Sequence, residues 1–313
     1  MNPIEQALAI VKNHSIKIHA GRLEILMKSL TMDGTKLCAK ELNGKGIYLN
    51  DKDQVYTHFN KIKKPGQKFD KHTLKIIWPA MAEYMDNGQW HKRLLSIQKA
   101  MNADDTICPT WKAGKNGSLY TSDPNIQGLC DKYLYPILCD HDHLRSVDYQ
   151  SMFPGVAAWL FSCENLKADY EGNAIYDFDF DDMPDDMCRK KNKVVFLALM
   201  FGSGLPNLSR RGLYPMDTLK TMKREMEYTY PFLKTLDNEG RDRIRRTSSY
   251  LFNKKFVELA TGEPPFHPIL IRHDQIIYTN PALSDEYDFR IALGTKFELC
   301  GTVKTWEEIA QDL

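Results

Sequence analysis

The stretch that decides the fold is LRSVDYQSMF, residues 144–153, which is followed by the apolar run VAAWL at 156–160. Val147 leads into an acid, Asp148, and the run after it has the composition of a buried helix. The pattern predicts a strand that ends in a carboxylate and then turns into a helix. An acid in that place can hold a metal ion against a bound substrate. The plainer alternative is an Asp that caps the next helix.

A second acid stands between two apolar runs of β type. The runs PILIR, 268–272, and QIIY, 275–278, flank the polar pair His273-Asp274. This arrangement predicts a hairpin with the polar pair at its turn. Two carboxylates on neighbouring strand ends can bracket two Mg²⁺ ions about 3.5–4 Å apart, an arrangement that serves phosphoryl or nucleotidyl transfer.

The segment between the two acids carries cations and apolar residues in register. MCRKKNKVVFLALMFG, 187–202, is predicted to be a helix that ends at Gly202. Steps of four residues drift by about 40°, so the following side chains form a slowly winding stripe: Arg189, Lys193, Leu197 and Phe201. Such a stripe would meet a triphosphate first and a base second. The alternative is an amphipathic helix with a solvated basic end.

Composition narrows the class of protein. The 313 residues are 42% hydrophobic, enough for a sizeable core in one or two domains. Lys plus Arg is 42 against 41 acids, so a nucleic-acid surface would be a local basic track. No apolar run reaches the ~18 residues of a membrane helix, and the beginning lacks the apolar core of a secretory signal. Seven cysteines without a CxxC pair favour reduced thiols and a cytoplasmic location.

Several motifs along the chain resemble those of the family A DNA polymerases, the bacterial DNA polymerase I type, and they occur in the order that this family has. Asp148-Tyr149 is similar to the first palm motif, and His273-Asp274-Gln275 to the third motif, which is usually His-Asp-Glu. The stripe at 189–201 is similar to the nucleotide-binding fingers helix. Three further segments extend the resemblance from about residue 16 to the C-terminus: TSDPNIQ at 121–127, YPF at 230–232, and FELCG at 297–301 with Trp306.

The resemblance implies an α+β chain with a right-hand polymerase fold, in which an antiparallel palm sheet carries helical fingers and a short helical thumb. The implied divisions are an N-terminal segment and thumb base at 1–70, thumb helices at 71–110, palm with the first catalytic motif at 111–182, fingers at 183–245, and palm with the second catalytic Asp at 246–313. The implied activity is template-directed addition of deoxynucleotides to a primer 3′ end. Proofreading is not expected, because no exonuclease acid cluster fits before residue 100.

The resemblance also implies the site residues. Asp148 and Asp274 are the expected catalytic residues, and with the Tyr149 backbone they are expected to bind two Mg²⁺ ions, for which Mn²⁺ can substitute. The incoming nucleotide is expected to meet Arg189, Lys193, Leu197, Phe201, Phe153 and Tyr176. The DNA is expected to meet Thr121, Ser122, Asn125, Gln127, Arg245, Arg246, His273 and Gln275. The expected partners are primer-template DNA, dNTPs and other replication proteins, with no membrane.

Several positions depart from the family pattern. Phe153 stands where a Glu usually blocks the ribose 2′-hydroxyl, and Gln275 replaces the Glu of the third motif. Leu197 takes the place of a base-stacking aromatic, and Tyr176 that of a His which reaches the phosphates. These changes leave a second hypothesis open, a nucleic-acid-binding accessory replication protein with impaired catalysis. The retained acids and fingers cations favour the enzyme.

Helices are also predicted elsewhere in the chain. Residues 3–12 suggest a short helix, and 72–101 a strongly helical thumb. Residues 218–246 suggest one long helical region, and its basic cluster at 241–246 would face the template or be an exposed helix end. Residues 289–306 are predicted to return to strands.

Overall fold

The computed structural model describes residues 2–29, 90–138, 143–149, 151–177, 189–210, 212–263, 266–272, 274–279, 287–295 and 297–311. The chain forms two compact units. The first comprises 1–16, 108–122 and 140–313, and the second comprises 17–107 and 123–139. The chain combines helices with small antiparallel sheets, which agrees with the predicted α+β class.

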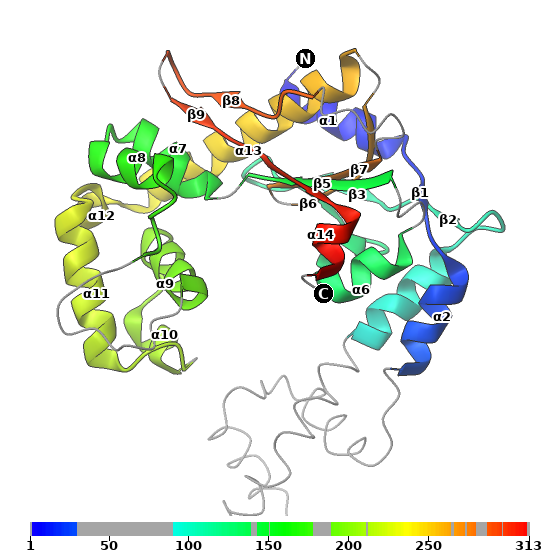
Figure 1. Ribbon diagram of the computed structural model, residues 1–313, viewed down its shortest axis with the longest axis horizontal. Coiled ribbons are helices and arrows are strands. Elements are labelled where there is room, and N and C mark those ends of the chain that lie inside the picture. The colour runs from blue at the N-terminus through cyan, green and yellow to red at the C-terminus, as the bar shows by residue number, and fades with distance from the viewer. Residues whose placement is uncertain are drawn as a thin grey trace, which may run out of the picture. The chain divides into compact units, whose positions relative to one another are not determined.

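The first unit is built on a four-stranded antiparallel sheet with the order β10-β5-β7-β6 (Figure 1). Its strands are β5 (Leu144–Asp148), β6 (His267–Arg272), β7 (Gln275–Thr279) and β10 (Thr302–Thr305). Pairing sets Asp148 of β5 opposite Gln275 of β7, and Gln275 opposite Arg272 of β6. The strand that ends in an acid and the hairpin around the second acid are both confirmed.

A tight turn joins β5 to the buried helix α7 (Met152–Leu160). Ser151 adopts the left-handed region at φ 56°, and the Met152 N–H donates to the Tyr149 carbonyl at 3.2 Å. Gly155 of α7 packs so closely that a Cβ there would lie 2.4 Å from the Leu299 side chain in β9 (Glu298–Leu299). The helix predicted after Asp148 is thus confirmed, and it packs closely against β9.

The long helix α13 (Asn238–Thr261) links the other parts of this unit. It begins where the Asp237 side chain accepts a hydrogen bond from the Gly240 N–H at 2.7 Å. It packs against α7 and against α1 (Pro3–Lys12), the short helix predicted at 3–12 (Figure 1). Phe252 of α13 meets the buried Tyr149 ring edge to face, with centroids 5.9 Å apart. The helix therefore supports the end of β5 from inside the core.

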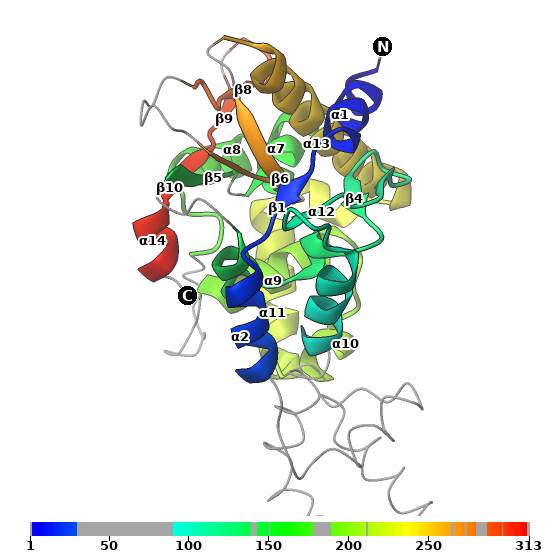
Figure 2. The same ribbon diagram turned by 90° about the vertical axis from the view of Figure 1, so that its right-hand side faces the viewer.

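A group of helices follows α7 and is gathered together in both views of the first unit (Figures 1 and 2). It comprises α8 (Glu164–Glu171), α9 (Arg189–Met200), α10 (Leu205–Arg210), α11 (Met216–Thr229) and α12 (Phe232–Thr235). The single helical region predicted over 218–246 was wrong in its continuity, because α11, α12 and the start of α13 divide it. The first break falls at Pro231, which has no N–H to donate, and the second at the extended Leu236.

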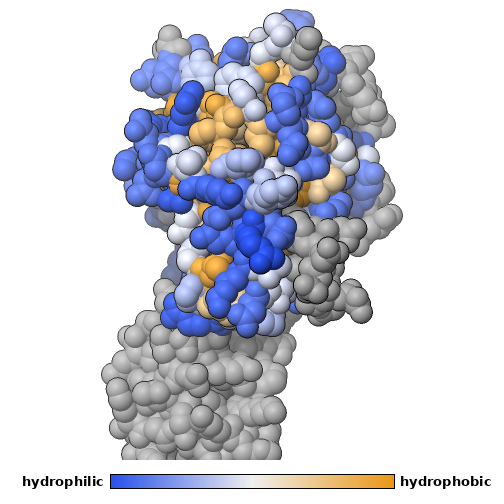
Figure 3. All heavy atoms as spheres, turned by 90° about the vertical axis from the view of Figure 1, so that its left-hand side faces the viewer, coloured by the Kyte–Doolittle hydropathy of each residue, from blue (hydrophilic) through white to orange (hydrophobic). Residues whose placement is uncertain are grey.

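Helix α11 carries opposite charges on its outer side. Lys220 pairs with Asp217 at 3.0 Å and Lys223 with Glu227 at 3.6 Å, as neighbours on one helix face. Figure 3 looks onto this side of the molecule and shows hydrophilic residues over much of it, around an apolar area. The charges of α11 are paired along the helix, so α11 supplies no basic track.

Two smaller strand pairs complete the first unit. β3 (Trp111–Ala113) pairs with β4 (Leu119–Thr121), and β8 (Ile291–Ala292) pairs with β9. α14 (Trp306–Gln311) follows β10 at Trp306, so the return to strands predicted over 289–306 is confirmed. Gly301 precedes β10, and a Cβ there would lie 2.5 Å from Val147, so this strand packs directly beside β5.

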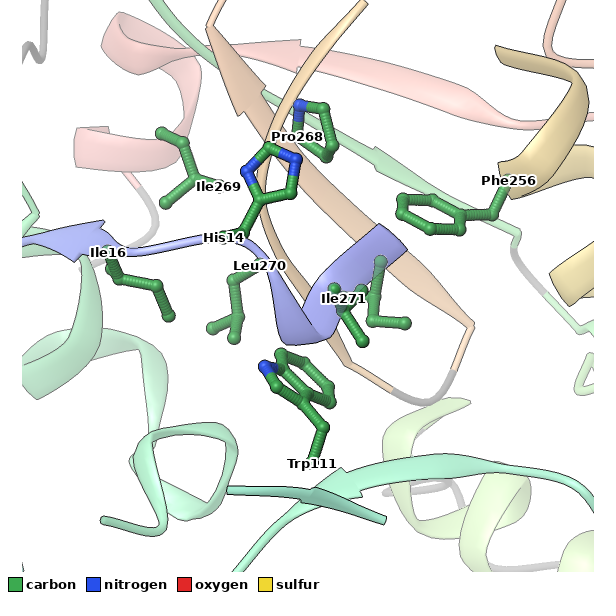
Figure 4. Close-up of a pocket in the computed structure, with 9 residues that line it drawn as sticks. His14, Ile16, Trp111, Phe256, Pro268, Ile269, Leu270 and Ile271 are labelled. Atoms are coloured by element: carbon green, nitrogen blue, oxygen red, sulfur yellow. The ribbon is translucent and has the colours of Figure 1, made fainter. Parts of the chain in front are cut away.

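A small pocket lies beside the edge strand β6, between the end of α1, β3 and α13 (Figure 4). Apolar side chains line most of it, among them Trp111, Phe256 and Leu270. His14 also lines it, and burial together with the charge of His267 lowers the pKa of His14. The pocket therefore holds a neutral imidazole in an apolar setting, and it contains neither of the predicted catalytic acids.

The second unit contains α2 (Ala20–Ser29), a helix over 90–100, and the paired strands β1 (Ile16–Lys17) and β2 (Thr106–Ile107). It also contains η1 (Ile126–Gly128), α6 (Asp131–Leu134) and η2 (Tyr135–Ile137). Arg93 donates to the Gly128 carbonyl, and its guanidinium lies over the Trp90 ring. Of the helical thumb predicted at 72–101, residues 90–100 are helical, and 72–89 lie outside the described residues. Within the described ranges, no helix has the length and apolarity to cross a membrane.

Candidate active site

The two predicted catalytic acids lie at adjoining ends of β5 and β7. The Tyr149 N–H, next to Asp148, donates to the Asp274 carbonyl at 3.0 Å. Because Asp148 is also the cross-strand partner of Gln275, both acids are within one residue of the same rung of the ladder. The sheet alone therefore brings together two residues that are far apart in the sequence.

The carboxyl of Asp274 is in an environment that disfavours its charged form. Burial raises the pKa of this carboxyl, while the cations Lys193 and Arg272 oppose the shift. Lys193 belongs to α9, so its charge reaches the acid from that helix. A buried carboxylate with incomplete compensation is a suitable place for an added cation.

The donor set around the acids suits a hard divalent ion. Asp148, Asp274 and the Tyr149 carbonyl offer oxygen, which Mg²⁺ prefers, and Mg²⁺ is commonly held by one or two carboxylates plus water and substrate phosphates. Across the described parts of the chain, no group of three or more His, Cys, Asp or Glu side chains could hold a metal ion. The oxygen donors of Asp148, Asp274 and Tyr149 are the type that Mg²⁺ prefers.

Helix α9 separates a buried face from an open one. Asn192, Val195, Phe196 and Met200 are buried, which fits the three- and four-residue spacing of one helix face. Of the predicted stripe, Arg189 and Lys193 are exposed, and Leu197 and Phe201 are half-buried. Gly202 follows with φ 81°, the left-handed conformation that commonly ends a helix. The order of two cations and then two apolar groups is therefore presented outward.

Tyr176 lies beside the two cations and interacts with Asp274. Arg189 and Lys193 have their charged groups 5.7 Å and 5.9 Å from the centre of its ring. Burial raises the pKa of Tyr176 to about 12, with the neighbouring Ser151 opposing the shift and Asp274 adding to it. A neutral phenol beside Asp274 thus connects the stripe with the end of β7.

Arg189 has partners within the protein. It forms an ion pair with Asp177 and donates to the Asn173 carbonyl at 2.6 Å and to the Asn173 side chain at 2.8 Å. Both members of the ion pair are substantially exposed, and an exposed pair is worth only about 0–1 kcal/mol. A phosphate, which takes stronger charge-assisted bonds, can therefore displace Asp177 at small cost.

Asn192 fixes α9 from its buried side. Its side-chain N–H donates to the Tyr176 carbonyl at 2.9 Å, and its oxygen accepts from the Tyr214 hydroxyl at 2.8 Å. Both bonds lie inside the protein and join α9 to the segments on either side of it. The sequence prediction missed this residue, although a lone amide among Val195 and Phe196 on the apolar face was a usable signal.

Asn192→Leu should lower the free energy of unfolding by about 1–3 kcal/mol, because two buried hydrogen bonds are lost and a bulkier apolar side chain takes the place of the amide. Chemical denaturation of the variant and the wild type measures the difference. Asn207→Leu is the matched control, since Asn207 is exposed on α10. An equal loss in both variants would show that the buried bonds contribute nothing particular.

Phe153 and Phe201 bring α7 and α9 together. Their ring centroids lie 5.1 Å apart at an interplanar angle of 84°, an edge-to-face contact. Phe153 is half-buried in the first turn of α7. Phe153, which stands where the family usually blocks the ribose 2′-hydroxyl, therefore lies against Phe201, the last residue of the predicted nucleotide-binding stripe.

The residues predicted to meet DNA are distributed over several elements. Thr121 is 2% exposed on β4, and Ser122 follows it at the surface. Asn125 and Gln127 belong to the second unit, where the Asn125 side chain accepts from the Gly128 N–H at 3.0 Å. Gln275 lies half-buried beside Asp148, and His273 lies outside the described residues.

The two predicted DNA-binding arginines of α13 differ in their surroundings. Arg245 pairs with Asp242 at 3.0 Å and lies over the Phe201 ring at 4.4 Å. Arg246 is exposed and donates to the Asp242 carbonyl at 3.3 Å. Of this pair, Arg246 presents its charge to solvent and Arg245 presents it to an aromatic ring.

Comparison with known proteins places this geometry in a fold. No family model matches the chain, and no curated protein matches it. The POL domain of Pol1 from M. smegmatis, in complex with DNA primer-template and dNTP, has a similar structure with a TM-score of 0.65. The similarity covers 98% of this chain and 70% of that chain, at 14% sequence identity. The chain therefore has a polymerase-like fold.

Proposed function

We propose that the chain is a DNA polymerase of the family A type, which adds deoxynucleotides to a primer 3′ end in the order set by a template. The observation that carries the proposal is the junction of Asp148 and Asp274, which faces the cationic side of α9 within a polymerase-like fold. Bound between the acids, two Mg²⁺ or Mn²⁺ ions would supply activation of the primer hydroxyl and stabilisation of charge on the triphosphate.

The chain's own residues would bind and orient the nucleotide. Lys193 is exposed beside Asp274 and can take the phosphates, with Arg189 one turn earlier on the same face. Leu197 and Phe201 would meet the base, and Phe153, which contacts the Phe201 ring, would meet the sugar. The neutral ring of Tyr176 contacts both cations and would help to hold them in place.

The DNA would be bound through backbone contacts. Ser122 and Arg246 are exposed, and hydroxyl and guanidinium groups suit phosphate contacts that position a duplex without reading its sequence. The divisions into thumb, palm and fingers, a cytoplasmic location and contacts with other replication proteins belong to the same proposal.

A primer-extension assay with Mg²⁺ or Mn²⁺ tests the proposal directly. A labelled primer on a template should lengthen by the complementary deoxynucleotides, and omission of one dNTP should stop extension at its template base. Arg189 engaged by Asp177, and Gln275 in place of an acid, favour the second hypothesis of an impaired accessory protein. Tight primer-template binding without any extension would support that protein instead.

Phe153→Ala should relax the preference for deoxynucleotides. A ribose 2′-hydroxyl pressed against the ring loses a water hydrogen bond, which costs about 1–3 kcal/mol, or roughly one to two powers of ten in selectivity. The measurement is the ratio of dNTP to rNTP incorporation in wild type and variant. Deoxynucleotide incorporation should be largely spared, and an unchanged ratio would make Phe153 a packing residue.

A further inference from the structure

Two arginines of α13 hold the end of α9. Arg241 donates from Nε to the Met200 carbonyl at 3.3 Å, and a Cβ on Gly202 would lie 2.9 Å from its guanidinium. Arg245, one turn further along α13, lies over the Phe201 ring with its guanidinium carbon 4.4 Å from the centroid. The last residues of α9 therefore take their position from α13 as well as from their own helix.

Phe201 transmits this contact toward the acids. Arg245 covers one face of its ring, and Phe153 meets the ring at 84° with centroids 5.1 Å apart. Phe153 stands five positions after Asp148, in the first turn of α7. A continuous line of contacts thus runs from α13 through α9 to α7.

The apolar character of Phe201 explains how a cation can help to position its ring. Phe201 has no polar group, so no hydrogen bond can fix its ring against Phe153. A guanidinium over the ring face supplies an electrostatic attraction to the aromatic system, which strengthens as the pair is withdrawn from water. The Arg245 side chain is 33% exposed and is held in turn by Asp242, so its place over the ring is constrained.

We propose that Arg245 is a positioning residue for sugar selection, and that it acts through Phe201 on Phe153. The inference rests on the proposed polymerase function and deepens it. It assigns Arg245 to the nucleotide side of the site, while Arg246, the next residue, keeps its proposed contact with a DNA phosphate. Arg245 touches neither the sugar nor the DNA in this role.

The test compares steady-state kcat and KM for one dNTP and the matching rNTP in primer extension. Arg245→Gln should lower the dNTP-to-rNTP selectivity about fivefold to tenfold. Arg245→Lys keeps a cation near the ring, so it should retain much of the wild-type selectivity. It also replaces the Gln variant if that variant unfolds. Arg246→Gln is the matched control, and it should weaken DNA binding and reduce its salt dependence while leaving the selectivity ratio unchanged.

A double-variant cycle shows whether the effect passes through Phe153. In a Phe153→Ala background, Arg245→Gln should change the selectivity ratio little further, since the residue on which it acts is gone. An unchanged ratio in Arg245→Gln, or an equal drop with and without Phe153, would overturn the inference while leaving the polymerase intact. No extension by the wild type would contradict the proposed function, and the inference would fall with it.

Discussion

Replacement of either acid by its amide, Asp148→Asn or Asp274→Asn, is expected to abolish primer extension while sparing binding of the primer-template. Each change keeps the shape of the side chain and removes the charge that would hold a metal. Charge stabilisation by a bound metal is worth several kcal/mol, which corresponds to about a thousandfold or more in rate. Single-turnover extension measures the loss, and fluorescence anisotropy of a labelled duplex measures binding.

The stability of Asp274→Asn separates a loss of chemistry from a loss of folding. Burial raises the pKa of Asp274 above its value in the unfolded chain, so the folded protein retains this proton more readily. Without metal, this group therefore adds stability as the pH falls through its folded pKa, and opposes folding at neutral pH. Asp274→Asn should equal or exceed the wild type in free energy of unfolding at neutral pH, in the presence of EDTA.

Acidification provides the control for that comparison. As the pH falls through the folded pKa of Asp274, the free energy of unfolding of the wild type should rise relative to that of the Asp274→Asn variant, because the variant lacks the titrating group. Denaturant unfolding at several pH values measures the difference between the two proteins. If either amide variant still extends primers at a normal rate, its acid has no catalytic role.

Local pattern was sufficient to predict the elements that carry the site. The strand before Asp148, the hairpin around Asp274 and the helix end at Gly202 each depend on a few neighbouring residues, and each is confirmed. The outward stripe of α9 follows from a helical period that also places Asn192 on the opposite, buried face. Periodicity predicts such features because the spacing of apolar residues over a few helical turns shows which face is buried and which is exposed.

Contacts between distant segments were not accessible to the same reasoning. The hydrogen bond from Tyr149 to Asp274 depends on strand order, and the placement of Arg245 over Phe201 depends on how α13 crosses the end of α9. Arg245 looked like one more cation of a basic cluster, since sequence spacing cannot show that an aromatic ring lies against it. The continuity predicted over 218–246 failed for a local reason, because Pro231 was present in the sequence as a helix-breaking residue.

Lys193→Gln is expected to weaken nucleotide binding more than any other single change on α9. The ammonium is exposed on the open face, and its charge already acts on Asp274. A charge-assisted bond to a phosphate is worth about 1.5–3 kcal/mol, so the KM for dNTP should rise about 10-fold to 100-fold. Arg189→Gln should have a smaller effect, because Arg189 must first release Asp177.

The matched control is Lys190→Gln, which removes an exposed cation from the same helix but outside the stripe. It should leave the KM for dNTP close to that of the wild type. Lys193→Gln has a second signature, since loss of a cation that opposes the raised pKa of Asp274 should move the acidic limb of the rate profile to higher pH. If Lys193→Gln lowers DNA affinity and leaves the KM for dNTP unchanged, α9 binds the duplex, and the nucleotide phosphates are held elsewhere.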